Sequence, residues 1–225
     1  MNQNLLRLIQ SGSTGELADA IVADPSLAEY RDPQGVSALL WTIYTGQAAA
    51  RDFFLARLAE RGVELDIFEA SALGDEARLR TIVTADPAAA QTFSGDGWTP
   101  LHLAAAFGTP AAVALLLHHG ATVDAVSKNP QRNQPLHAAL ALGRNSMTIQ
   151  LLLDRGADTN AVQAGGFTAI FSAATANRRD LAELLVAHGA NPRHVTDQGK
   201  TAAQFARERG FTELADWLDM LPDSA

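Results

Sequence analysis

The chain has 225 residues and a formal net charge of −8 at pH 7, and 47% of its residues are hydrophobic. The acidic balance argues against a nucleic-acid or anionic-membrane partner, because phosphate groups bind to basic surfaces. Disulfides and cysteine-based zinc sites are excluded, because the sequence contains no cysteine. The first four residues lack the positive charge of a secretory signal, and no apolar run reaches the ~20 residues that span a bilayer. We therefore expect a cytoplasmic protein without a membrane segment.

Residues 3–66 look like a divergent copy of residues 67–126, displaced by 62 positions. The copies share glycine, leucine and alanine positions, at Gly12 and Gly74, Leu17 and Leu79, and Ala23 and Ala85. Each copy begins with a short two-helix unit, whose second helix ends near an Asp-Pro dipeptide. A longer two-helix unit follows, and it begins with a hairpin-shaped loop that we call a finger. Gly74 follows Gly62 by only twelve positions, which is too few for a full hairpin finger at that place.

The segment GWTPLHLAAAFG at residues 97–108 shows how a full unit begins. Gly97 permits a tight turn, Thr99 is a helix cap, and Pro100 stands early in the helix, where its missing N–H has no cost. A second helix carries leucines at core spacing and ends at Gly120. We expect Gly120 to adopt the left-handed conformation of a helix C-cap.

The same frame returns three times, as QPLHAALALG at 134–143, TAIFSAATAN at 168–177 and TAAQFARERG at 201–210. The residues that head the four strings are 35, 34 and 33 positions apart: Thr99, Gln134, Thr168 and Thr201. A period near 33 residues with a T-P-L-H-x-A core is typical of ankyrin repeats. The chain therefore resembles the ankyrin-repeat family.

This resemblance implies an all-α solenoid of about seven helix-turn-helix units with short, β-hairpin-like fingers. We expect one continuous domain over 1–225, with units at about 3–30, 31–66, 67–93, 94–126, 127–161, 162–195 and 196–221. In this family the motif histidine hydrogen-bonds neighbouring backbone, so His102 and His137 are expected to connect adjacent fingers. The fingers and the first helices line a concave face that usually holds a partner protein.

Mapped onto that face, the candidate partner-binding residues form an apolar ridge and a longer finger: Val36, Tyr44, Trp98, Phe107, Lys128, Gln131, Arg132, Asn133, Leu142 and Phe167. Val36, Trp98 and Phe167 stand at equivalent positions just before the helix cap. Exposed aromatic rings at such positions would be strong anchors for a partner. The alternative is that these rings pack against neighbouring fingers and only cover the core.

The finger of unit 127–161 has about two additional residues within 128–132 and carries two positive charges on an acidic chain. Insertions in solenoids often map to the binding face. This finger either reaches over a partner or is simply a looser loop.

The sequence lacks the HExxH, phosphate-loop and G-x-S-x-G motifs of metal, nucleotide and nucleophile chemistry. We therefore expect a monomeric, non-catalytic module, without cofactor or metal, that binds a protein partner as a scaffold or an inhibitor. The sequence does not identify the partner. Two alternatives remain: a small-molecule or enzymatic function in a pocket between fingers, and self-association through the apolar ridge.

Overall fold

The computed structural model describes residues 2–141 and 145–222. Within these ranges the chain forms fourteen α-helices and two short 3₁₀ helices, so the expected all-α fold is confirmed. The α-helices contact one another in consecutive pairs. Their bounds are α1 (Asn2–Ser11), α2 (Thr14–Ala23), α3 (Ala38–Tyr44), α4 (Ala48–Glu60), α5 (Ile67–Leu73), α6 (Glu76–Ala85), α7 (Pro100–Ala106), α8 (Pro110–His118), α9 (Pro135–Ala141), α10 (Ser146–Asp154), α11 (Ala169–Thr175), α12 (Arg179–Ala187), α13 (Ala202–Glu208) and α14 (Thr212–Met220). The 3₁₀ helices are η1 (Pro25–Glu29) and η2 (Pro87–Gln91).

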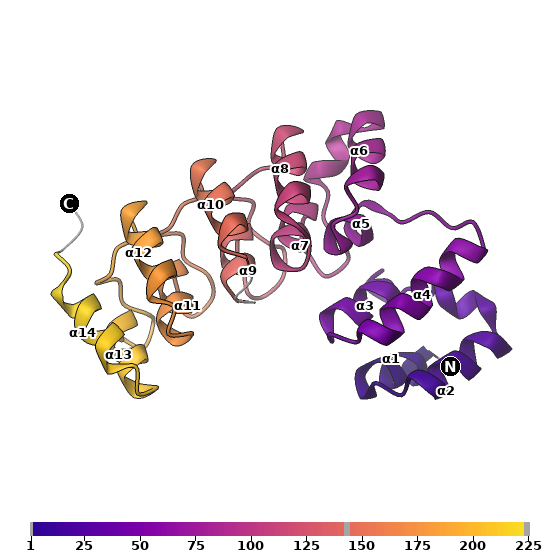
Figure 1. Cartoon of the computed structure of the whole chain (residues 1–225), viewed down its shortest axis with the longest axis horizontal. Helices are drawn as coiled ribbons and strands as arrows, with labels where there is room; N and C mark the ends of the chain where they lie inside the picture. Colours follow the sequence, from indigo (N-terminus) through magenta and orange to yellow (C-terminus); the bar gives the residue numbers. More distant parts are fainter. Residues whose placement is uncertain (1, 142–144, 223–225) are drawn as a thin grey trace.

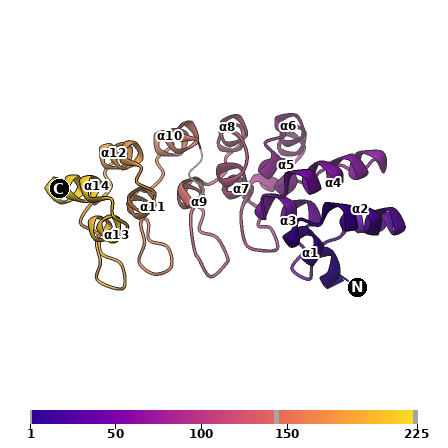
Figure 2. The ribbon, with the colours of Figure 1, turned by 60° about the horizontal axis from the view of Figure 1, so that its bottom comes forward.

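The helix pairs follow one another in a row from the N-terminus to the C-terminus (Figure 1). The first helix of each pair contacts the first helix of the next pair along the whole row. In Figure 2, α8, α10 and α12 lie in one row, α7, α9, α11 and α13 lie in a second row beneath it, and the fingers extend below. The expected solenoid is thus confirmed, and its fingers all project from one side.

The helix ends follow the pattern that the sequence predicts. The hydroxyl of Thr99 accepts a hydrogen bond from the backbone N–H of His102 at 3.3 Å, so Thr99 caps α7. Gly120 follows α8 with a φ of +85°, which confirms the predicted left-handed conformation.

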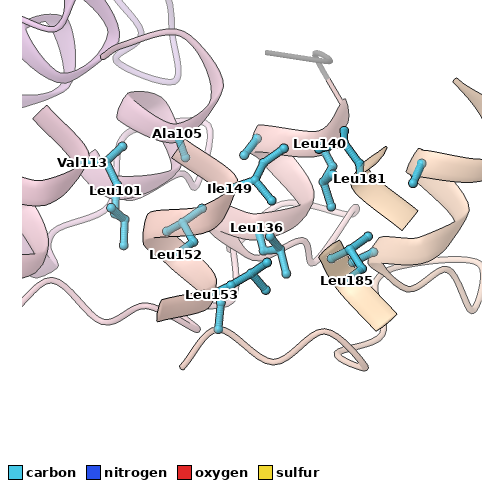
Figure 3. Packing of buried hydrophobic residues seen from close by; sticks show 14 of the residues in the cluster. Leu101, Ala105, Val113, Leu136, Leu140, Ile149, Leu152, Leu153, Leu181 and Leu185 are labelled. Atoms are coloured by element: carbon cyan, nitrogen blue, oxygen red, sulfur yellow. The ribbon is translucent and has the colours of Figure 1, made fainter. Parts of the chain in front are cut away.

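The main hydrophobic core runs continuously from α5 to α14. Leucines and other aliphatic residues of both helix rows interdigitate in its middle, among them Leu101, Leu136 and Leu152, which are fully buried (Figure 3). Alanines such as Ala105 occupy the first helices, and their small side chains permit the close approach of neighbouring pairs. This core holds the row of first helices rigidly in place.

Backbone hydrogen bonds join three successive pairs of fingers at their tips. The N–H of Lys128 donates to the carbonyl of Gly97 at 2.8 Å, and that of Ala164 donates to Gln131 at 2.9 Å. The N–H of Asp197 continues the series by donating to the carbonyl of Gly165 at 3.1 Å. The fingers from residue 94 onward therefore form a connected edge.

Buried histidines add a second set of connections between fingers. Nε2 of His102 lies 3.0 Å from the carbonyl oxygen of Asn133, and Nε2 of His137 lies 3.1 Å from that of Ala161. Each imidazole thereby joins one unit to the finger of the next. The role expected for both histidines is confirmed.

The N-terminal pairs, α1 to α4, have a hydrophobic core of their own around Phe54, Leu39 and Leu17. Residues 61–66 connect α4 directly to α5, so the prediction that no full finger fits there is confirmed. As a result, the fingers at 31–37 and 94–98 become neighbours. A Cβ atom added to Gly95 would lie only 1.7 Å from the carbonyl oxygen of Gln34, so only glycine permits this approach.

Candidate functional site

A groove of about 730 Å³ lies where the missing finger brings separate units together. It is bordered by the C-terminal ends of α3 and α7 and by three fingers, those at 31–37, 94–98 and 127–133. Its lining residues are Gln34, Tyr44, Ser94, Gly95, Asp96, Gly97, Trp98, Phe107, Lys128, Asn129, Pro130 and Gln131. The groove is thus built from units that are far apart in the sequence.

Three half-buried aromatic rings form the apolar part of the groove. The ring centroid of Tyr44 lies 5.4 Å from that of Phe107 and 6.4 Å from that of Trp98. The rings of Trp98 and Phe107 stack with centroids 6.1 Å apart and planes inclined by 27°. At these separations the rings support one another, so each has a fixed orientation before any partner binds.

Buried aliphatic residues support the three rings from within. They form a small cluster of their own between the two larger cores: Val36, Leu40, Ala72 and Leu103. Trp41 packs against the edge of Tyr44, and its Nε1 donates to the carboxylate of Asp32 at 2.9 Å. The groove therefore lies over the junction between the N-terminal core and the main core.

Negative charge surrounds the hydroxyl group of Tyr44. This hydroxyl is buried and forms no hydrogen bond of good geometry with the described residues. Burial raises the pKa of Tyr44 well above its ordinary value, and the carboxylates of Asp96, Asp32 and Asp66 raise it further, Asp96 most strongly. Tyr44 is therefore a neutral hydrogen-bond donor in an acidic part of the groove.

The finger at 127–133 forms the opposite wall. The amide nitrogen of the Asn129 side chain donates to the carbonyl of Asp96 at 3.3 Å, which fixes this finger to the preceding one. The ammonium of Lys128 lies over the ring of Phe93, 3.9 Å from its centroid. The additional residues thus form an ordered wall of the groove, and this wall contacts residues of the preceding units.

Five of the predicted partner-binding residues come together in this groove: Tyr44, Trp98, Phe107, Lys128 and Gln131. Arg132 is exposed beside them, with a φ of +50°. The rings at the C-terminal ends of α3 and α7 are therefore neighbours in space, although 63 positions separate Tyr44 from the C-cap residue Phe107 in the sequence.

The other predicted residues lie elsewhere. Val36 is only 1% exposed and Asn133 only 7%, so both side chains support the fingers instead of facing a partner. Phe167 packs against Phe171 and Phe205 in a separate cluster, with centroids 5.4 and 5.5 Å away, which matches the alternative of rings packed between units. Leu142 lies outside the described residues.

Gln34, Asp96 and Asn129 are among the lining residues that were absent from the predicted set. All of them occupy finger tips, and that position was the signal that could have identified them. The sequence could not show which tips become neighbours, because this depends on the direct connection between α4 and α5.

The described residues contain no group of three or more His, Asp or Glu side chains that could hold a metal ion. Burial lowers the pKa of His102 to about 4, and it also lowers the pKa of His137. Each imidazole hydrogen-bonds a backbone carbonyl outside its own helix, and neither imidazole lines the groove. The groove thus offers aromatic faces and finger-tip polar groups, an arrangement suited to binding.

Comparison with known proteins agrees with the repeat geometry. A family model described as ankyrin repeats (3 copies) matches residues 67–163 and 145–220. The chain belongs to the ankyrin-repeat family. Ankyrin repeats are generally protein–protein interaction modules, and the fold is a non-catalytic one.

Two curated relatives share part of the ankyrin-repeat chain. The B-cell lymphoma 3 protein homolog of Mus musculus is 35% identical over 120 residues, which cover 53% of this chain and 26% of the relative. The mitochondrial disaggregase of Homo sapiens is 30% identical over 131 residues, which cover 58% of this chain and 18% of the relative. The aligned part is thus about a quarter or less of each relative's length. No helix in the described part of this chain is long and apolar enough to cross a membrane.

Proposed function

We propose that this ankyrin-repeat chain is a non-catalytic module that binds a partner protein in the groove between the fingers at 94–98 and 127–133. The observation that carries the proposal is the gathering of three aromatic rings, Tyr44, Trp98 and Phe107, at one half-buried site. Aromatic residues are enriched among the side chains that contribute most to protein–protein binding energy. Finger-tip polar groups around the rings supply hydrogen bonds at the rim.

The rigidity of the groove favours tight binding. The fingers are joined to one another by backbone hydrogen bonds, and the rings rest on a buried aliphatic cluster. A surface that is already ordered loses little conformational entropy when a partner docks. Within this proposal the chain either positions its partner or blocks the partner's own site.

The test begins with proteins captured from a native extract on the immobilised full chain. Each captured protein is identified, purified and titrated calorimetrically against the wild type and the Trp98→Ala/Phe107→Ala double variant. We expect the double variant to bind at least about tenfold more weakly, because it lacks two anchoring rings. Circular dichroism and thermal unfolding verify that the variant remains folded.

The double variant Phe167→Ala/Phe205→Ala is the matched control, because it removes two rings from a cluster outside the groove. This control should bind with nearly wild-type affinity. Equal affinities of the wild type and the Trp98/Phe107 variant for every captured protein would contradict the proposal. If the only captured protein were a second copy of the chain, light scattering would show the dimer, and self-association would replace partner binding.

A further inference from the structure

Asp96 lines the groove beside the aromatic rings, and its carboxylate forms no ion pair with a cationic side chain of the described residues. Its side chain accepts a hydrogen bond from the Ser94 hydroxyl, and none of the described cationic side chains lies within 4.0 Å of its carboxylate. Asp96 lines the groove, and among the neighbouring charges it contributes most to the raised pKa of Tyr44. The groove therefore combines aromatic faces with an acidic group that can still accept a cation.

The other acidic groups near Tyr44 already have partners. Asp32 accepts hydrogen bonds from the backbone N–H groups of Gln34 and Val36 and from the indole of Trp41. Asp66 pairs with Arg31 at 2.9 Å. Of the three aspartates that act on Tyr44, only Asp96 has neither a positive partner nor a set of N–H donors among the described residues.

Lys128 is the cationic side chain among the residues that line the groove, and it contacts another group. The ammonium of Lys128 is held over the Phe93 ring, where a cation–π contact stabilises it. Lys128 therefore does not neutralise Asp96. The excess of negative charge in the groove fits the whole chain, whose net charge is −8.

We propose that the groove binds an arginine side chain on an extended segment of the partner, with the guanidinium over Trp98 and against the carboxylate of Asp96. A guanidinium is planar, stacks on aromatic faces, and donates two parallel hydrogen bonds to a carboxylate. The ammonium group of a lysine, on its flexible stem, satisfies only part of this arrangement, because it is not planar and does not donate two parallel hydrogen bonds. This inference rests on the proposed protein-binding function and specifies the chemistry of the partner.

The experiment selects displayed random twelve-residue peptides on the immobilised full chain. The selected peptides are synthesised with arginine and with its uncharged analogue citrulline, and their dissociation constants are measured. We expect the selected peptides to share an arginine, and its replacement by citrulline to weaken binding about tenfold or more. The variant Asp96→Asn should cause a loss of similar size, because it removes the charge and keeps the shape.

The matched control is Asp197→Asn, which changes an exposed aspartate at the tip of the last finger. It should leave peptide affinity unchanged. Peptides that lack arginine, that prefer lysine, or that bind Asp96→Asn as tightly as the wild type would overturn this inference. If such peptides still lost affinity for Trp98→Ala/Phe107→Ala, the protein-binding groove would stand without the arginine. A library that yields no peptide dependent on Trp98 and Phe107 would contradict both proposals.

Discussion

His102 shows how one buried residue connects two repeats and links stability to pH. Its Nε2 hydrogen-bonds the carbonyl of Asn133, and its Nδ1 accepts the backbone N–H of Thr99 at 3.2 Å. Only the neutral imidazole can donate at one nitrogen and accept at the other. Protonation would place a second hydrogen against the N–H of Thr99, in a site where burial already lowers the pKa to about 4.

We therefore expect the wild-type free energy of unfolding to fall as the pH decreases from about 6.5 to about 4. In that window the unfolded chain binds a proton at His102 that the folded chain rejects. The variant His102→Gln should be less stable at pH 7, but its stability should depend less steeply on pH in this window. Urea unfolding at several pH values measures the difference. His118→Gln, which removes an exposed imidazole, is the control, and equal slopes for His102→Gln and wild type would contradict the prediction.

Side-chain size explains why equivalent sequence positions have different roles. Val36 and Trp98 both stand just before a helix cap, and the repeat pattern predicts both on the concave face. The short, β-branched Val36 ends within the core, whereas the ring of Trp98 extends far enough to line the groove. The repeat register could be predicted from the sequence, but the exposure of each side chain depends on the packing of its neighbours.

At the scale of elements, α5 follows a connection without a finger, yet it begins with a capping box as α7 and α13 do. Its N-terminus is closed by a capping box: Asp66 accepts the N–H of Glu69 at 2.8 Å, and Glu69 accepts the N–H of Asp66 at 2.9 Å. Asp66 also pairs with Arg31 of the finger at 31–37. The cap thus starts the helix and connects it to the preceding unit.

The variant Asp66→Ala should lower the free energy of unfolding by about 1 kcal/mol, which is the usual effect of losing a helix cap. The ion pair with Arg31 adds little, because both side chains are partly exposed. Urea unfolding measures the loss. Asp52→Ala removes an exposed carboxylate from α4 and should change stability much less. Equal losses of unfolding free energy in Asp66→Ala and Asp52→Ala would contradict the prediction, because Asp66 would then contribute no more than an exposed carboxylate.

The groove itself could be predicted only in part. Glycines and threonines at a period near 33 identify the helix ends and the fingers, because turns and caps depend on local sequence. The short stretch from Gly62 to Gly74 predicts a missing finger. The contact of Gly95 with Gln34, and hence the meeting of Tyr44 with Trp98, follows from the three-dimensional stacking of non-adjacent units.

At the scale of the whole molecule, the solenoid contains two large cores that meet beneath the groove. The N-terminal core belongs to α1 to α4 and the main core to α5 to α14. The junction consists of a small cluster that includes Leu40 on one side and Leu103 on the other. Because a repeat array is stabilised by contacts between neighbours, each core can open with a free energy of its own.

We therefore expect core substitutions to act mainly on their own side of the junction. Phe54 is fully buried in the N-terminal core, and Phe54→Ala should cost about 3–5 kcal/mol in that part of the chain. Amide hydrogen exchange should then accelerate strongly in α1 to α4 and much less in α9 to α14. Leu152→Ala, in the main core, is the reciprocal variant and should give the opposite distribution. Uniform acceleration over both parts in the two variants would show that the chain unfolds as one cooperative unit. The groove, whose rings span the junction, would then share the stability of the entire solenoid.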